Sequence, residues 1–389
     1  METKLVQRRY DLDWLRVLAF TGVFFYHCSR FFNSDNWNIK NAETSPLIDI
    51  LTNIFELWGM PLIFAISGAS IFFALRPGGA TRFLRNRVLR LLVPLVLGIL
   101  VLAPPQVYLD RLTHGKFSGS FLEFIPQFFQ TANFAWTGIH LWYLEYLFLF
   151  TLILIPLFTW LKHSSGQNAL KWLSRFSIRS GVIFLWALPF ALLTILLDPF
   201  GMTKAALPES LLRLVLYPIF LVYGYLIFAD DPIQQAIIRL RRIALALALA
   251  FTLAAPTVVN ALGQSPTFPH FALLMVLASM LIWSSILAIL GYGMRYLKVN
   301  RRPLAYANEA VLPFYILHQP VILILGYFIV PLQLSILAKY LIIAPLAFGI
   351  TLGLYEYGVR RVSLMRRIFG LKARKLDLPA VTLAVQPSP

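Results

Sequence analysis

The sequence has little charge and almost no cysteine. Only 13% of its 389 residues are charged, while 59% are apolar, against about 25% charged residues in a typical soluble domain. This composition excludes an ordinary soluble enzyme. The single cysteine, Cys28, excludes an internal disulfide and a cysteine-rich metal site. There is no polar region of domain size on which the net charge of +17 could form a nucleic-acid surface, so nucleic acid is not an expected partner.

What the sequence has instead is long apolar runs. A helix needs about 20 largely apolar residues to cross the hydrocarbon core of a bilayer. The sequence therefore predicts an all-α, polytopic membrane bundle, with one transmembrane domain at 1–375 and a short tail at 376–389. Ten spans are predicted, at 14–33, 50–75, 89–108, 138–160, 181–198, 209–229, 243–262, 270–293, 304–330 and 336–358.

The basic residues predict the orientation of these spans. Of the 34 Lys and Arg residues, 26 lie in the N-terminal tail, in alternate connectors and in the C-terminal segment 360–375, and 4 lie in the opposite set of connectors. Basic residues are retained in short cytoplasmic loops. We therefore expect both termini in the cytoplasm, a multi-pass protein of the bacterial inner membrane, and contact between its basic segments and anionic lipids.

The first span carries the ionisable pair Arg16 and His27. An ionisable side chain inside a span faces a cavity or a partner and is a functional candidate. Eleven residues at 100° each end about 20° from three full turns, so both side chains share a face, roughly 16 Å apart along the axis. One cavity or tunnel could therefore contact both. The alternative for Arg16 is ordinary snorkelling to the interface with Asp13 as its partner.

Further ionisable residues are predicted at the outer depth of the bundle. Glu56, Glu145 and His318 reach a depth similar to that of His27 in the predicted topology, as does His140 unless it lies among headgroups. A neutral histidine beside a carboxylate suits general-base chemistry on a hydroxyl group. Which acid assists His27 stays open. The spacing of these residues fits no zinc motif, so no metal is expected.

A cluster of arginines precedes the third span. Arg82, Arg85, Arg87 and Arg90 lie within nine residues and lead to Pro94. Such a cluster can hold the phosphates of a nucleotide through charge-assisted, bidentate contacts. The retention of positive charge in cytoplasmic loops would also explain four arginines at this place, and the sequence favours neither interpretation over the other.

These features resemble the membrane-bound acyltransferase 3 family. The resemblance spans essentially the whole chain and rests on five motifs, which are the Arg16 to His27 spacing, Gly59-Met-Pro-Leu with Ser67-Gly68, Arg87-x-x-Arg90 before Pro94, Leu141-Trp-Tyr-Leu, and Tyr315-Ile-Leu-His318. Members of the family pass acyl groups from a cytoplasmic thioester to carbohydrate hydroxyls on the outer side. The chain is similar to the short, single-domain branch that includes succinyltransferases of periplasmic glucans. It departs from the longer O-antigen-type members, which read Trp-Ser-Leu-Glu, at Trp142-Tyr-Leu-Glu145.

The resemblance implies an acyltransferase with His27 in the catalytic centre, Arg16 on the face beneath it, and Arg87 and Arg90 on the acyl-CoA side. The depth of the ionisable residues in the predicted topology adds Glu56, Glu145 and His318 to His27 as expected catalytic residues. The expected donor is acyl-CoA, either succinyl-CoA or acetyl-CoA, with no permanently bound cofactor, and the expected acceptor is a periplasmic glucan or another envelope glycan. The expected substrate-binding residues are Asp13, Arg16, Arg85, Arg87, Arg90 and Trp142.

Two other function classes stay open at this point. A proton-coupled transporter of a carbohydrate or lipid-linked glycan would use the same histidines and carboxylates as a proton relay. A scaffolding membrane protein would use them to join helices. The sequence also leaves open whether the acyl group moves directly or through an acyl-enzyme intermediate.

Overall fold

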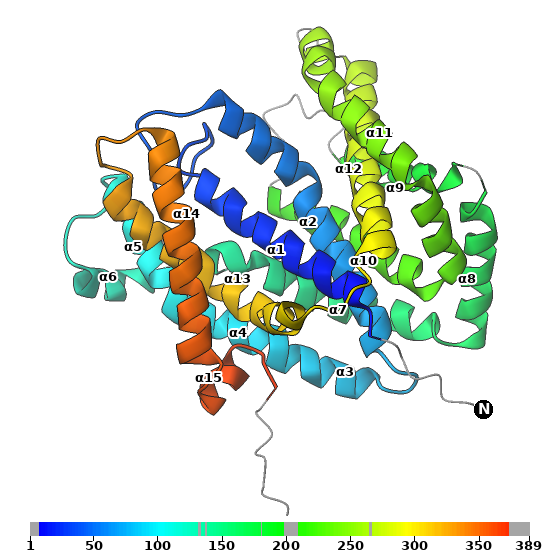
Figure 1. Cartoon of the computed structure of the whole chain (residues 1–389), viewed down its shortest axis with the longest axis horizontal. Helices are drawn as coiled ribbons and strands as arrows, with labels where there is room; N and C mark the ends of the chain where they lie inside the picture. Colours follow the sequence, from blue (N-terminus) through cyan, green and yellow to red (C-terminus); the bar gives the residue numbers. More distant parts are fainter. Residues whose placement is uncertain are drawn as a thin grey trace, which may run out of the picture.

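The chain folds into a bundle of helices (Figure 1). The computed structural model describes residues 8–130, 134–136, 138–179, 181–197, 209–263 and 267–372, with the backbone alone at 209–212 and 262–263. No strand occurs in these ranges. The α-helices are α1 (Tyr10–Ser29), α2 (Pro46–Ala74), α3 (Ala80–Arg87), α4 (Val93–Leu97), α5 (Ala103–Thr113), α6 (Phe121–Phe128), α7 (Trp142–Trp160), α8 (Ser164–Ser177), α9 (Ala187–Leu197), α10 (Glu209–Ala229), α11 (Asp231–Gly263), α12 (Phe268–Tyr296), α13 (Arg302–Ile329), α14 (Ile336–Gly353) and α15 (Ser363–Ile368).

Each predicted span coincides with helical structure, but the count of ten stays a prediction. In the described part of the chain, seven helices are long and apolar enough to cross a membrane, or up to eight if the bent pair α8 and Val182–Leu197 forms one span. Helix α1, whose first turns carry Asp11, Asp13 and Arg16, is not among the seven. Two further predictions differ in detail, because α11 begins at Asp231, inside a predicted connector, and the predicted tail 376–389 lies outside the described residues.

The third predicted span is one long helix with two wider turns. Ala80–Thr113 contains π-helical turns at Val88–Leu92 and Gly98–Leu102. Each precedes a proline, Pro94 or Pro104, which lacks an N–H and whose ring collides with the carbonyl four residues earlier. Widening the turn relieves that collision and keeps the helix continuous. The arginine cluster at the start of this helix thus connects rigidly to the interior of the bundle.

Glycines allow helices α2 and α10 to approach closely. A Cβ atom on Gly68 would lie 1.9 Å from the carbonyl oxygen of Leu221, and one on Gly224 would lie 1.8 Å from that of Ala65. Small residues at helix contacts are typical of membrane bundles, where backbone proximity replaces the hydrophobic effect. The Ser67-Gly68 sequence therefore has a packing role at Gly68.

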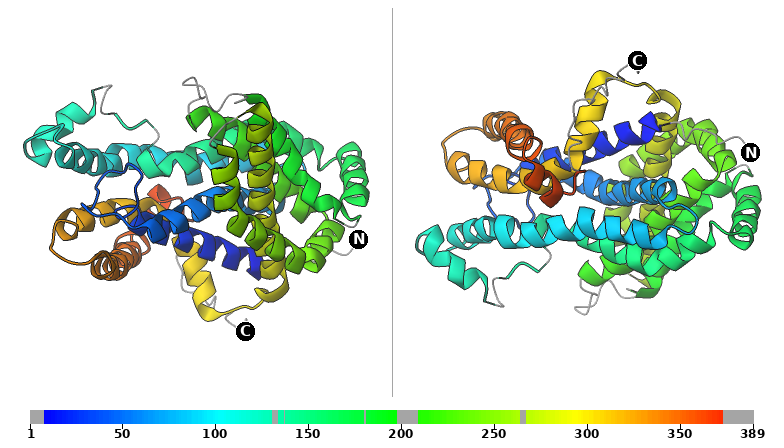
Figure 2. Two further views of the ribbon diagram at one scale, coloured as in Figure 1. Left: turned by 90° about the horizontal axis from the view of Figure 1, so that it is seen from above. Right: turned by 90° about the horizontal axis from the view of Figure 1, so that it is seen from below.

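Helices α1 and α2 occupy the middle of the bundle. Helix α1 packs against α2, α12 and α13. In both views of Figure 2, α1 and α2 lie between the Ala80–Thr113 helix on one side and α13 with α14 on the other. A side chain on α1 is therefore surrounded by other helices, which is how a polar residue avoids lipid.

The basic segments meet at one end of the molecule. Arg9 donates to Gln234 Oε1 at 2.9 Å, Trp14 Nε1 donates to Val299 O at 3.1 Å, and Arg90 Nε donates to Gly370 O at 3.2 Å. Nearby, Lys162 Nζ lies 3.8 Å from the centroid of the Phe72 ring, and partial burial lowers the pKa of Lys162 to about 8. The segments that the charge pattern groups together are thus also together in space.

Candidate active site

One face of α1 carries Arg16, Phe20 and His27 in sequence. Steps of four and seven residues lie close to whole turns of a helix, so the three side chains form a column along the axis. The column begins near the basic end and runs into the bundle, because α1 is enclosed by α2, α12 and α13. The predicted common face of Arg16 and His27 therefore points inward.

Arg16 joins three helices by hydrogen bonds. Its guanidinium donates to Asn308 Oδ1 on α13 at 2.8 Å and to Ser70 Oγ on α2 at 2.7 Å. The predicted contact with Asp13 is also present, at 3.4 Å. A guanidinium held in a fixed orientation from three directions is a positioned group rather than a snorkelling one.

His27 and His318 form a directed pair. His27 Nδ1 lies 2.8 Å from His318 Nε2, and His318 Nδ1 lies 2.6 Å from the carbonyl oxygen of Tyr315. A carbonyl oxygen only accepts, so His318 Nδ1 carries the proton. In a neutral pair His318 Nε2 then accepts from His27 Nδ1–H, which leaves the lone pair of His27 on Nε2. This arrangement sets the tautomer that a general base needs.

His140 is held by a second backbone carbonyl of α13. His140 Nε2 lies 3.1 Å from Ile316 O. In an unbroken helix this carbonyl would accept from the N–H four residues later, but that residue is Pro320. The proline therefore frees an acceptor inside the bundle, and the imidazole satisfies it. In addition, the hydroxyl of Tyr315 donates to the carbonyl oxygen of His140.

A cavity of about 600 Å³ adjoins these imidazoles. We call it the histidine cavity, because His27 and His140 both line it. Aromatic rings make up much of the rest of its wall, including those of Trp142 and Tyr217, which stack with centroids 5.7 Å apart. Arg213 also lines it, with its guanidinium carbon 4.5 Å from the centroid of the Trp142 ring. The cavity thus combines basic nitrogens, a cation and flat apolar surfaces.

A layer of three aromatic rings separates the Arg16 level from the His27 level. Phe20 contacts Tyr143 and Tyr315 edge to face, with centroids 5.8 and 5.2 Å away, and the two tyrosines are 5.8 Å apart. The hydroxyl of Tyr143 lies 2.6 Å from Ser67 Oγ. Both tyrosines are therefore anchored by their hydroxyls, whereas Phe20 is held only by ring contacts.

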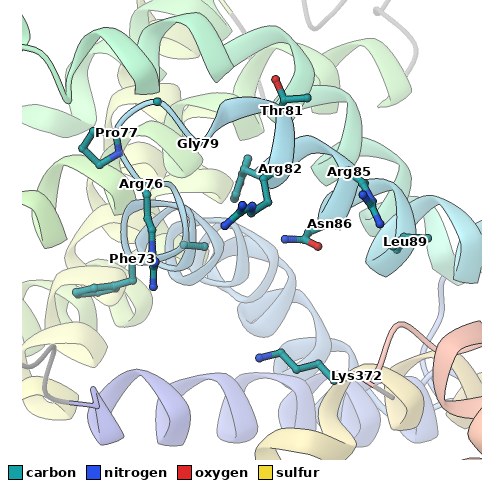
Figure 3. A pocket seen from close by; sticks show the side chains of 13 residues that line it. Phe73, Arg76, Pro77, Gly79, Thr81, Arg82, Arg85, Asn86, Leu89 and Lys372 are labelled. Atoms are coloured by element: carbon teal, nitrogen blue, oxygen red, sulfur yellow. The ribbon is translucent and has the colours of Figure 1, made fainter. Parts of the chain in front are cut away.

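A second cavity, of about 1120 Å³, lies at the basic end. We call it the basic cavity, because Arg76, Arg82, Arg85 and Lys372 line it. Figure 3 shows that Arg82 and Asn86 project from α3 into the space that faces Lys372. Four positive side chains around one opening attract a polyanion such as a nucleotide.

Comparison with known proteins identifies the family. A family model described as "Acyltransferase domain" (Acyl_transf_3) matches residues 9–356. The chain belongs to the acyltransferase 3 family. The match includes the column on α1, the arginine cluster and the α13 histidine, so the resemblance based on the sequence motifs is confirmed. The protein is thus a member of a transferase family with several apolar helices suited to a membrane.

Curated relatives match over almost their whole length. "Glucans biosynthesis protein C" of Salmonella paratyphi A and that of Salmonella agona are each 25% identical over 377 residues, covering 94% of this chain and 95% of the relative. The protein of the same name from Salmonella schwarzengrund is 24% identical with the same coverage. No solved structure matches.

In this acyltransferase 3 protein, two of the predicted catalytic residues line the histidine cavity, and a third contacts one of them. His27 and Glu56 line the cavity, and His318 contacts His27. The carboxylate of Glu56 accepts from the hydroxyl of Tyr26 and lies 3.5 Å from Arg30. The catalytic roles themselves stay predictions.

The fourth predicted catalytic residue lies elsewhere. Glu145 is on α7 and is not one of the described residues that line the histidine cavity. Its Oε2 is buried and has no hydrogen-bond partner among the described residues. The hydrogen-bonded partner of His27 in the structure is another histidine, so neither Glu56 nor Glu145 takes that place.

The predicted substrate-binding arginines divide into two groups. Arg85 lines the basic cavity, whereas Arg87 packs over the Phe83 ring at 4.8 Å and Arg90 donates to Gly370 O. Asp13 accepts from Arg8 Nε at 2.8 Å as well as from Arg16. The predicted Trp142 does line the histidine cavity.

Four cationic residues that line the cavities are not among the predicted site residues. Arg76, Arg82 and Lys372 line the basic cavity, and of these the sequence pattern names only Arg82, as a member of the arginine cluster. Arg213 lines the histidine cavity, and its place inside an apolar predicted span is the same kind of signal that identifies Arg16. Among the described residues no group of three His, Cys, Asp or Glu side chains is arranged to hold a metal.

Proposed function

We propose that this protein is an O-acyltransferase that moves an acyl group from acyl-CoA to a hydroxyl of a glucan. The observation that carries the proposal is a pair of hydrogen bonds, from His27 to His318 and from His318 to the Tyr315 carbonyl. These bonds leave a lone pair on Nε2 of His27, which lines a cavity. A neutral imidazole with a fixed tautomer is the commonest general base for a hydroxyl group.

The basic cavity supports acyl-CoA as the donor. CoA carries phosphates at one end and the thioester at the end of a flexible arm, so it needs a cationic site and a narrow path to the base. Arg76, Arg82 and Arg85 would hold the phosphates. The arm would pass Arg16 and the aromatic layer to reach His27, a rise of roughly 16 Å along α1. With the basic end in the cytoplasm, the donor enters from inside and the acceptor from outside.

The names of the relatives and the wall of the histidine cavity support a glucan as the acceptor. The relatives named above are glucan biosynthesis proteins. Trp142 and Tyr217 line the cavity, and an aromatic lining suits the apolar face of a sugar ring. The imidazole nitrogens of His27 and His140 in the same wall suit the hydroxyl groups of the sugar.

The transfer step follows from the tautomer of His27. Nε2 of His27 removes the proton of the acceptor hydroxyl, and the oxygen attacks the thioester carbonyl carbon. The C–S bond then breaks, and the CoA thiolate takes the proton back from the imidazolium. His318 accepts from His27 Nδ1–H throughout and stabilises the transient charge. We favour direct transfer, because the described residues that line the histidine cavity include no Ser, Thr or Cys.

Of the two expected acyl groups, succinyl suits the histidine cavity better. Succinyl carries a free carboxylate, whereas acetyl carries none. The guanidinium of Arg213 lies against Trp142 in the wall of the cavity. A guanidinium in the wall of a cavity attracts a carboxylate and can form charge-assisted hydrogen bonds with it.

The test is acyl transfer by the purified protein in lipid vesicles. Isotope-labelled succinyl-CoA and a glucan are supplied, and mass spectrometry detects the succinylated glucan. We expect transfer by the wild type and a loss of about 1000-fold in His27→Ala, because general-base catalysis contributes on that scale. Size-exclusion chromatography of the variant checks its fold.

Two results would contradict the proposal. Undiminished transfer by His27→Ala would remove His27 as the base. Glucan crossing the vesicle membrane, with no acylated product, would favour the transporter that the sequence left open.

A further inference from the structure

The two imidazoles of the histidine cavity differ in which nitrogen is engaged. His27 is bonded through Nδ1 and His140 through Nε2. Both flank the ring of His318, whose centroid lies 5.0 Å from that of His27 and 5.3 Å from that of His140. Each neutral ring then has one remaining lone pair, on Nε2 of His27 and on Nδ1 of His140.

The orientation of His140 is determined by the backbone around it. Its Nε2–H donates to Ile316 O, an acceptor that Pro320 makes available. Its own carbonyl oxygen accepts from the Tyr315 hydroxyl. Because Ile316 O only accepts, the proton of a neutral His140 is on Nε2, and Nδ1 is an acceptor.

That acceptor has no partner within the described residues. His140 is 4% exposed, and its Nδ1 is a buried atom without a hydrogen bond there. A buried polar atom without a partner is costly, so a ligand that supplies the missing hydrogen bond is stabilised there. His140 also lines the histidine cavity. The group that completes it must be a hydrogen-bond donor, and the most abundant donors on a sugar are its hydroxyl groups.

We propose that His140 Nδ1 accepts a hydrogen bond from a second hydroxyl of the acceptor sugar, while His27 Nε2 takes the proton of the hydroxyl that reacts. The inference rests on the proposed function and deepens it, since it assigns His140 as a positioning residue for the acceptor. The acceptor must then present two hydroxyls of one sugar unit to two imidazoles. A sugar lacking the second hydroxyl leaves Nδ1 unpaired, which is how a site built for a hydroxyl rejects the deoxy analogue.

Two substitutions separate the two nitrogens of His140. In His140→Gln the amide N–H₂ can still reach Ile316 O, but the acceptor at the position of Nδ1 is lost. In His140→Asn the shorter amide keeps an oxygen near the position of Nδ1 and loses the contact with Ile316. The first variant removes the proposed contact with the sugar, and the second removes the contact with the helix.

The experiment measures kcat/KM for a glucan oligosaccharide and for a set of its monodeoxy analogues. For the wild type we expect kcat/KM to be about tenfold lower for one analogue, besides the one that lacks the reacting hydroxyl, than for the parent sugar. For His140→Gln we expect kcat/KM for the parent sugar to be about tenfold below that of the wild type. The same variant should show no further decrease in kcat/KM with that analogue. His140→Asn should still discriminate against the analogue, whatever its absolute rate.

Equal discrimination by wild type and His140→Gln would overturn the inference, because a merely structural histidine leaves the ranking of the analogues unchanged. Binding of the same sugars, followed by tryptophan fluorescence, gives a second measurement that needs no acyl transfer. If the wild type transfers no acyl group, but its binding discriminates against the analogue and that of His140→Gln does not, the proposed function fails and the His140 contact stands. If the wild type is active, but neither measurement shows this difference between wild type and His140→Gln, only the His140 contact fails.

Discussion

The two cavities hold their functional groups in opposite ways. In the basic cavity, Arg76, Arg82 and Arg85 are exposed side chains. At the histidine cavity, His140 and His318 are buried, and each is bonded to a backbone carbonyl of α13. Exposed charges act over distance and tolerate movement, whereas a buried imidazole that is bonded to a backbone carbonyl is held in one orientation. The first arrangement suits the capture of a polyanion, and the second suits the transfer of a proton.

The largest effect that sharpens this contrast is expected at His318. In His318→Leu the Nδ1–H of His27 loses its acceptor, and we expect kcat to fall about 100-fold with the KM for acyl-CoA unchanged. His318→Gln, whose amide oxygen can accept that hydrogen bond, should recover part of the loss. Steady-state kinetics on both variants makes the test, and equal activity of the two would show that hydrogen bonding to His27 is not the role of His318.

A smaller effect, of a different kind, is expected at the basic cavity. Arg82→Ala and Arg85→Ala should each raise the KM for acyl-CoA about tenfold with little change in kcat, because a charge-assisted phosphate contact is lost before the chemical step. The wild-type KM should also rise with salt. Arg361→Ala is the matched control, since Arg361 belongs to the same basic end but pairs with Glu356. An equal rise in the KM of Arg361→Ala would show that general positive surface charge, and not the basic cavity, binds acyl-CoA.

The smallest effect is expected at the aromatic layer between the Arg16 level and the His27 level. Phe20 is held by ring contacts and not by a hydrogen bond, so Phe20→Ala removes one of the three rings of the layer without breaking a hydrogen bond. We expect hydrolysis of acyl-CoA without acceptor to rise roughly threefold, because water gains access to the thioester. A thiol reagent that detects released CoA measures this hydrolysis. An unchanged rate of release would show that the ring does not keep water from the thioester.

The sequence predicted part of this site because helical spacing is local. The eleven residues from Arg16 to His27 place both on one face of any helix, and the spans follow from length and hydropathy. The importance of His318 was also predictable as an ionisable group in an apolar span. That it contacts His27 was not, since 291 positions separate the two residues. The sequence likewise could not show that Arg82 and Arg85 line the basic cavity while Arg87 and Arg90 do not. That difference depends on the direction of each side chain on α3 and the following turn.

The order of residues alone predicts a helical membrane protein with most of its basic residues on one side, because hydropathy and charge patterns are properties of the linear chain. It also predicts the common face of Arg16 and His27 on α1. The tautomer of each histidine depends instead on how the helices pack, because it is set by the atom that each ring nitrogen contacts. For His27 that atom is Nε2 of His318, and for His140 it is the carbonyl oxygen that Pro320 leaves without a helical partner.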